Sequence, residues 1–356
     1  MGRERARTRC RERLDLIARS AIGSDELRRD AVEELRAAIG FETWCWPVAD
    51  PSSLLPFDAL ADLEPAFMQA MPRYLFLGES GADFNLRLLS VGSERLTARF
   101  GELTAGDFAR SPGWDECMRG AGMGDFVTTA CRDSQGCWGW FQPRRTSDER
   151  PFTTEDAAFL GVVAPSLGEI TRRAAADTPR TDALPELPPP AVAIFSEDLR
   201  QTASTPAAQA WLGSFITYPE AVLGAIIGRA LAGRDRTQHP AHVRLATSTG
   251  AWATLDGAVM DGFDEPHVAI TLRAATSDEV LDILCRAYGL SSREAALARQ
   301  VVRGLSTRQI AERLCISPHT VKDHLKSMFR KVGVATRGEL VSELTGRVTC
   351  DSAAVI

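Results

Sequence analysis

The most regular pattern of apolar and polar positions lies near the C-terminus. Ser291 followed by Glu294 is a capping-box pattern that predicts the start of a helix, and Gly304 predicts its left-handed end. Ser306 followed by Gln309 repeats the pattern and predicts a second, short helix. Apolar residues recur at helical spacing in both segments, so each predicted helix has one face that packs inward.

A third helix is predicted over residues 318–332. Ser317 occupies its N-cap, and Pro318 stands at the first helical position, where a missing N–H costs nothing. Cys315 and Ile316 form a tight turn between the second and third helices, and two helices joined in this way are typical of a helix-turn-helix. At ~100° per residue, the third helix collects its apolar side chains on one face: Val321, Leu325, Met328, Phe329 and Val332.

The opposite, polar face of this third helix is the candidate DNA-contacting surface. In a helix-turn-helix, the N-terminal half of the second helix meets base edges, and the free N–H groups at a helix start favour a phosphate. The candidates for base contacts are Lys322, Asp323, Lys326 and Ser327; those for phosphate contacts are Arg308, His319, Thr320 and the backbone from Ser317; Arg330 also points away from the predicted core.

A final helix is predicted up to Leu344, because Thr336 and Glu339 form a third capping box. Residues 278–347 hold nine Arg and three Lys against eight acidic residues, a net charge of +4. The whole chain has a net charge of −6, so the remaining residues carry −10. An acidic body with a basic end is the distribution expected when only that end meets phosphates.

The first 175 residues mix helical spacing with strand-like alternation, and the turn residues 133–136 indicate a β-hairpin. The expected elements are a helix at 25–39, a strand at 41–48, the hairpin strands 125–131 and 137–142, and a helix beginning at Thr153 with a kink at Pro165.

Five prolines between residues 177 and 190 predict a stiff, extended linker over 176–190. A strand, helices and an antiparallel meander then predict a second α+β module. Its expected elements are a strand at 191–195, helices at 205–212 and 219–231, a hairpin of 242–247 and 252–260, and a strand at 267–272.

Residues 287–344 closely resemble the LuxR-type helix-turn-helix. The resemblance is carried by the segments Leu290–Glu294, Gly304–Ser306, Gln309–Leu314, Ile316–His324 and Lys331–Val334. It implies that Lys322 and Lys326 contact DNA and that the last helix, Thr336–Leu344, forms a dimer interface. Asp323 is acidic, whereas a surface that contacts DNA is expected to be basic. A carboxylate disfavours phosphate but accepts a hydrogen bond from cytosine, so we expect an atypical target sequence.

Two further resemblances concern the rest of the chain. Gly136–Trp140 followed by Pro151–Asp156 resembles the end of the GAF domains of actinobacterial regulators, and 191–273 resembles a short PAS-like module with Pro206–Leu212 as its first helix. The expected fold is therefore multidomain. Its parts are a GAF-like α+β domain at 1–175, the Pro-rich linker at 176–190, a short PAS-like α+β module at 191–275, and an all-α four-helix LuxR-type helix-turn-helix domain at 278–346.

Several residues of the first domain are candidates for sensing a signal. Its tryptophans either line a pocket for a small apolar ligand or pack against the sheet as core: Trp44, Trp46, Trp114, Trp138 and Trp140. Cys131 and Cys137 flank the predicted hairpin turn. A three-residue loop would place them opposite each other as a redox pair, whereas a two- or four-residue loop would place them on opposite faces.

Composition and motifs exclude other classes of protein. Hydrophobic residues make up 44% and charged residues 25% of the chain, and no stretch approaches the ~20 apolar residues of a membrane span. The Arg-rich start lacks the apolar run of a secretory signal, so we expect a cytoplasmic protein without membrane contact. His239, His242 and His267 have no carboxylate or thiol at ligand spacing, so no metal and no other cofactor is expected. No G-x-S-x-G, Walker A, H-E-x-x-H or C-x-x-C motif indicates an enzyme.

The sequence thus predicts a one-component transcriptional regulator that binds double-stranded promoter or operator DNA. We expect a homodimer, with RNA polymerase and a small-molecule ligand as further candidate partners. The N-terminal modules either sense a signal or only hold the dimer together, and the sequence leaves both readings open.

Overall fold

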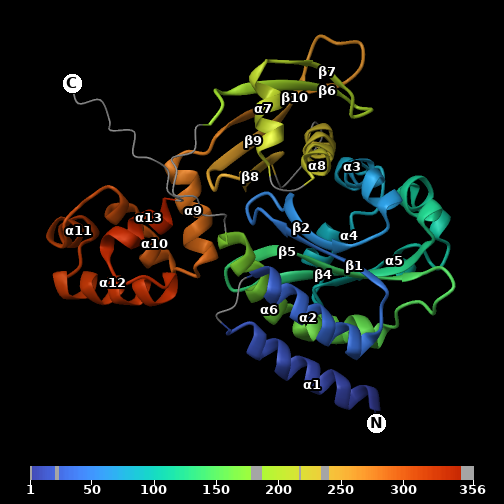
Figure 1. The fold of residues 1–356 in the computed structure, drawn as a ribbon, viewed down its shortest axis with the longest axis horizontal. Helices are drawn as coiled ribbons and strands as arrows, with labels where there is room; N and C mark the ends of the chain where they lie inside the picture. Colours follow the sequence, from blue (N-terminus) through green and yellow to red (C-terminus); the bar gives the residue numbers. More distant parts are fainter. Residues whose placement is uncertain (1, 21–23, 178–186, 216–217, 234–239, 346–356) are drawn as a thin grey trace.

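A computed structural model describes residues 2–20, 24–177, 187–215, 218–233 and 240–345. Figure 1 shows two α/β units side by side, coloured blue to green and yellow to orange, with a group of red helices beyond them. Residues 178–186 of the predicted linker and His239 lie outside the described residues.

The first unit is built on an antiparallel sheet of five strands in the order β2-β1-β5-β4-β3. The predicted hairpin is β4–β5, and Asp133 pairs with Gly136, so its loop contains two residues. The strands are β1 Thr43–Ala49, β2 Pro56–Asp62, β3 Thr97–Arg99, β4 Met123–Asp133 and β5 Gly136–Thr146.

Helices cover both faces of this sheet. On one face lie α1 Gly2–Ile17, α2 Ser24–Ile39 and α6 Thr154–Ala176; on the other lie α3 Pro65–Ser80, α4 Leu86–Gly92 and α5 Phe100–Leu103, followed by the short helices Phe108–Arg110, Trp114–Met118 and Arg119–Ala121. The predicted cap of α6 is present as a full capping box between Thr153 and Asp156. The helix continues through Pro165.

The second unit contains another antiparallel sheet, in the order β7-β6-β10-β9-β8. All of its predicted strands and helices are present, and a short edge strand, β7, is added to them. The elements are β6 Ala191–Ser196, β7 Gln201–Ser204, α7 Ala207–Ser214, α8 Pro219–Ala232, β8 His242–Ala246, β9 Trp252–Met260 and β10 His267–Ala274.

The two units meet where α8 packs against α3 (Figure 1). Two glycines make this approach possible. A Cβ on Gly224 would lie 2.2 Å from the carbonyl oxygen of Pro72, and one on Gly228 would lie 2.6 Å from that of Phe76. One hydrophobic cluster consequently runs from α3 of the first unit through α8 and the second sheet to the C-terminal helices.

The C-terminal region differs in one respect from the predicted four-helix domain. Five helices are described between residues 277 and 344: α9 Ser277–Ala287, α10 Ser292–Val302, α11 Thr307–Leu314, α12 Pro318–Val332 and α13 Arg337–Leu344. The additional helix is α9, which a capping box between Thr276 and Glu279 begins. It packs between α6 of the first unit and the helices α10 and α13.

Candidate nucleic-acid interface

Capping residues determine where helix α12 begins and where it ends. The Ser317 hydroxyl accepts a hydrogen bond from the Thr320 N–H at 3.0 Å, and Pro318 follows as the first helical residue. Gly333 ends the helix in the left-handed conformation, with φ of 80°. The turn before α12 is the predicted one, and Cys315 adopts a positive φ of 53° there. The predicted helix-turn-helix, from α11 to α12, is therefore present at the expected residues.

The inward face of α12 also agrees with the prediction. Val321, Leu325 and Met328 are buried, and Phe329 and Val332 pack partly buried against the same cluster. Eight residues besides Ser317 are proposed for DNA contact; six of them are exposed, and two are half-buried. The exposed ones are Arg308, His319, Lys322, Asp323, Lys326 and Arg330; the half-buried ones are Thr320 and Ser327.

Two of these residues have partners that the sequence pattern did not indicate. The Asp323 carboxylate lies 2.9 Å from Nδ1 of His319, one helical turn earlier. Arg308 forms a similar exposed pair with Glu312, at 3.1 Å. Both pairs keep their side chains on the surface, where the pairs are weak and open to exchange for another partner.

Ser327, a candidate for base contact, lies close to a residue of α10. Its side chain is half-buried, and a hydrogen bond with it contributes to lowering the pKa of the Glu294 carboxyl. Lys331 donates to the same carboxylate at 2.7 Å and to the Gly289 carbonyl at 3.0 Å. Ser327 therefore helps to hold α12 against α10, on the side of the helix that lies away from Lys322.

Glu294 is the centre of this attachment. Its side chain is 5% exposed and accepts the Ser291 N–H at 2.7 Å, which completes the capping box of α10. Burial favours the neutral acid, but the hydrogen bonds from Lys331, Ser291 and Ser327 outweigh it and lower the pKa of Glu294 to about 2. The caps at Ser291 and Ser306 are both full capping boxes, as predicted.

The third predicted capping box is half formed. The Thr336 hydroxyl accepts the Glu339 N–H, but the Glu339 carboxylate accepts the N–H of Ala335 instead of that of Thr336. Leu340 and Leu344 of α13 are buried against the other C-terminal helices, while Val341 is partly buried.

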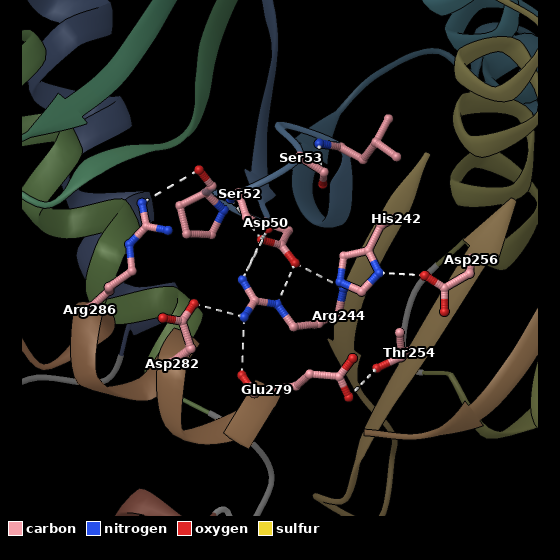
Figure 2. A network of polar contacts seen from close by, with 12 residues as sticks. Asp50, Ser52, Ser53, His242, Arg244, Thr254, Asp256, Glu279, Asp282 and Arg286 are labelled. Carbon is pink, nitrogen blue, oxygen red and sulfur yellow. Dashed lines mark hydrogen bonds and ion pairs between the residues drawn. The ribbon is translucent and has the colours of Figure 1, made fainter. Parts of the chain in front are cut away.

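A polar junction joins α9 to both α/β units (Figure 2). Arg244 of β8 donates from Nε and from a terminal nitrogen to the two oxygens of Asp50, each at 2.7 Å. Its other terminal nitrogen bonds Asp282 at 3.0 Å and the Glu279 carbonyl at 3.1 Å, both on α9. Burial opposes ionisation of Asp50, but Arg244 holds the pKa of this carboxyl below its usual value. No sequence motif marks these residues, which lie in three distant segments.

Two more arginines fasten α9 to the first unit. Arg286 donates to the Gln135 carbonyl in the β4–β5 turn at 3.1 Å and lies over the ring of Trp138. Arg172 of α6 bonds both Asp133 and the Ala287 carbonyl at the end of α9. The C-terminal helices are therefore connected to the α/β units by side chains as well as by the chain itself.

The five candidate ligand-binding tryptophans do not gather around one cavity. Trp44 and Trp46 belong to the core under α1, α2 and α6; Trp114 lies in the α3 side core; Trp138 belongs to the cluster shared with the C-terminal helices; Trp140 packs with Leu54 and Ala130. Four of the indole N–H groups have internal acceptors: Thr171 for Trp46, Met123 for Trp114, Asp133 for Trp138 and Arg87 for Trp140.

The register of the β4–β5 hairpin places Cys131 and Cys137, the candidate redox pair, on opposite faces of the sheet. Because the loop has two residues, Cys131 packs on the α6 side of the sheet and Cys137 lies in the separate cluster of Trp140. Both thiols are free and buried. Burial raises the pKa of Cys131 above its usual range and that of Cys137 to about 11, which disfavours the reactive thiolate.

The described histidines of the second unit have ordinary partners. His242 lies 2.6 Å from Asp256, and His267 contacts the Glu265 carbonyl and stacks on Phe263. Within the described ranges, no three His, Cys, Asp or Glu side chains are arranged to hold a metal ion. Nor does any helix of that part of the chain have the length and apolar character needed to cross a membrane.

Comparison with known proteins identifies the C-terminal helices. Residues 289–344 match the family of bacterial regulatory proteins of the luxR family, so this segment is a LuxR-type helix-turn-helix domain. An HTH-type transcriptional regulator of Mycobacterium bovis is 43% identical over 63 residues, which are 17% of this chain and 7% of that protein. A nitrate/nitrite response regulator protein homolog of Haemophilus influenzae is 46% identical over 48 residues, 14% of this chain and 23% of that protein. The chain thus matches only a small part of either relative.

A solved structure, that of SdiA from Escherichia coli, is 13% identical in sequence. The alignment covers 95% of this chain and 97% of that one, with a TM-score of 0.36.

Proposed function

We propose that this chain is a sequence-specific DNA-binding transcriptional regulator, and that its LuxR-type domain contacts DNA through the exposed face of α12. The observation that carries the proposal is the polar, basic surface of a helix whose apolar face, N-cap and C-terminal glycine are all fixed. A helix held in this way can enter the major groove without first becoming ordered.

Individual roles follow from the position of each side chain on α12. Lys322 and Lys326 are assigned to base edges in the major groove. Asp323 is assigned to a cytosine amino group, because its pairing with His319 orients a carboxylate rather than a cation toward the groove. Arg308, Thr320, Arg330 and the N–H groups from Ser317 are assigned to phosphates, and His319 either contacts phosphate or orients Asp323.

We infer that two copies of the chain bind together. Two recognition helices that enter successive major grooves on one side of the DNA require half-sites about one helical turn apart. The exposed side of α13 is assigned to the contact between the two copies. RNA polymerase remains a predicted partner.

The experiment that tests the proposal selects bound sites from a randomised DNA library with the full-length chain. The wild type is expected to enrich one motif with two half-sites, and Lys322→Ala and Lys326→Ala are expected to lose or relax positions within it. Arg200→Ala is the matched control, since Arg200 is an exposed cation in the β6–β7 turn of the second unit. Enrichment of no motif by the wild type would contradict sequence-specific binding.

We further propose that the two α/β units control the DNA-binding domain through the junction at Arg244. This supports a sensing role over a purely dimerising one, because Arg244 connects Asp50 of the first unit to Asp282 of α9. A shift of the first unit against the second would change both contacts of this one side chain. The test is binding of the selected DNA site by Arg244→Met. Altered affinity with unchanged base preference is expected, and an unchanged affinity contradicts the coupling.

A further inference from the structure

Helix α1 is the outermost helix of the first unit. It lies along the lower edge of Figure 1, and the helices that it packs against, α2 and α6, are both on its inner side. Cys10, Leu14 and Ile17 are buried in the core that these three helices share. The outer side of α1 is therefore a helix face that no described element covers.

Helical periodicity and burial together define this outer face. Arg5, Arg9, Glu12 and Leu16 stand at positions i, i+4, i+7 and i+11, so they form one stripe along the helix. The stripe lies on the side of α1 away from its buried residues, and all four side chains are exposed. Leu16 is 59% exposed, which is unusual for a large apolar side chain. Asp15 is exposed beside the same stripe.

The outer stripe has a basic half and an acidic half. Arg5 and Arg9 occupy the first half of α1, whereas Glu12 and Asp15 occupy the second half. Among the residues that the structure describes, the side chains of Arg5, Arg9 and Glu12 have no hydrogen-bond or ion-pair partner. Asp15 accepts one hydrogen bond, from the Ser166 hydroxyl at 2.6 Å. The charges of the stripe are thus available to a partner outside the chain.

Helix α2 extends the same polarity. It runs antiparallel to α1, because Arg13 bonds Glu34 at 3.2 Å and Arg3 lines the same surface depression as Arg36. The first half of α2 therefore lies beside the acidic half of α1. It carries one exposed arginine, Arg29, against five carboxylates that are exposed or half-buried. These are Asp25, Glu26, Asp30, Glu33 and Glu34. The surface that α1 and α2 form consequently has a basic end and an acidic end.

A surface with this polarity is complementary to a second copy of itself that runs in the opposite direction. When two α1 helices lie antiparallel, Arg9 comes opposite Glu12, and Arg5 comes opposite Asp15 and Leu16. A two-fold axis repeats each of these contacts, so both halves of the stripe are paired at once. Two parallel helices would instead place like charges together. We propose that α1 is an interaction surface for α1 of a second copy of this chain, and that the two helices pair antiparallel.

The size and charge of this surface determine how strongly it associates. Helix α1 has 16 residues and is ~24 Å long, so a pair of such helices buries less than the ~1,200 Å² of a standard interface. Salt also weakens ion pairs between exposed side chains. The pairing is therefore weak and sensitive to salt, and it adds to the contact that DNA brings about between two copies. It deepens the proposed binding by two copies, but it can be measured without DNA.

The test is sedimentation velocity of the full-length chain without DNA, over a concentration series at about 0.05 and 0.5 M NaCl. The wild type should dimerise, with a dissociation constant about tenfold higher at the higher salt concentration. Arg5→Glu combined with Arg9→Glu makes the stripe wholly acidic, and Glu12→Arg combined with Asp15→Arg makes it wholly basic. Each double variant alone should dimerise about tenfold more weakly than the wild type. An equimolar mixture of the two should form a heterodimer at least as tight as the wild-type dimer.

Arg110→Glu combined with Arg200→Glu is the matched control. It makes the same change in net charge as the Arg5 and Arg9 pair, at two exposed arginines away from α1, and should leave the dissociation constant unchanged. A wild type that stays monomeric, double variants that dimerise like the wild type, or a mixture that stays monomeric would each overturn the proposal. If a double variant does not fold, the single variants Arg9→Glu and Glu12→Arg are compared alone and mixed in the same way. DNA site selection is a separate measurement, so the two proposals fail separately.

Discussion

The guanidinium of Arg244 holds both oxygens of the Asp50 carboxylate, at 2.7 Å each, across 194 residues of chain. Both side chains are buried. The pair lies where the first unit, the second unit and α9 meet, and Arg244 also bonds Asp282 and the Glu279 carbonyl of α9 (Figure 2).

Asp50→Asn should lower the free energy of unfolding by about 3–5 kcal/mol, because it leaves a buried guanidinium without its main carboxylate. Urea unfolding followed by circular dichroism measures the change. Asp282→Asn removes the second, half-exposed carboxylate of the same arginine and should cost less than about 1 kcal/mol. Equal effects of the two variants would mean that Asp50 is not the principal partner.

Gly224→Ala should disrupt the contact between α8 and α3. The added Cβ would lie 2.2 Å from the Pro72 carbonyl oxygen, so the helices must separate at a cost of about 1–3 kcal/mol. Thermal unfolding and limited proteolysis between the units measure this. Gly213→Ala in α7 is the control, since no atom lies within 4 Å of the added Cβ and helix propensity favours alanine. A variant at Gly224 as stable as the wild type would show that the two helices adjust freely.

Acid should weaken the attachment of α12 to α10. The pKa of folded Glu294 is about 2, below its ordinary value of 4.5, so its stabilisation is complete above pH 4.5 and is lost as pH falls toward 2. Glu294→Gln should lose about 2 kcal/mol at pH 6, after allowance for solvent screening, and much less at pH 3. Thermal unfolding at both pH values tests this, with Glu312→Gln as an exposed control. A variant whose deficit is the same at both pH values would contradict the assignment.

Lys326→Ala should weaken binding to the selected DNA site by about 1–3 kcal/mol and relax the preference at one base position. Competition binding with single-base variants of the site measures both effects. An equal loss of affinity for every sequence, with a smaller dependence on salt, would assign Lys326 to a phosphate instead.

Thiol reactivity should be confined to the turn of the helix-turn-helix. In a Cys350→Ser background, which removes the thiol outside the described residues, a chromogenic disulfide reagent should react quickly with one group, Cys315. This cysteine is exposed, whereas burial raises the pKa of Cys10, Cys45, Cys117, Cys131, Cys137 and Cys285. Cys315→Ser should abolish the fast phase. Fast reaction of Cys131 or Cys137 would reopen a redox role.

The helix starts of the C-terminal domain could be predicted because their signals are local. Ser291 and Glu294 lie three residues apart, so the sequence itself holds both partners of the cap. The same signal at Thr276 and Glu279 could have predicted α9. Helical periodicity places Ser327 on the polar face of α12, but it does not show the Glu294 carboxylate that the neighbouring helix α10 brings close to it.

The contacts that unite the chain could not be predicted in this way. Asp50, Arg244 and Asp282 are isolated charges in the sequence, and only the folded chain brings them together. Arg144 lies just beyond the predicted strand 137–142, where no local signal indicates burial, yet its side chain is buried against Phe67 of α3. Nothing in the sequence distinguishes Gly224 and Gly228 from other helix residues. Only the fold shows that they let the backbone of α3 lie close to α8.

Arg172, Arg244 and Arg286 attach α9 to the two α/β units, and this attachment has a consequence for the spacing of the DNA half-sites. A DNA-binding domain on a flexible linker can follow its half-site when base pairs are inserted. A domain attached rigidly to the α/β units keeps its distance and angle from the domain of the second copy. Operators of this protein should therefore be strict in their spacing: five base pairs added between the half-sites would turn one of them to the far side of the duplex, out of reach of the second α12.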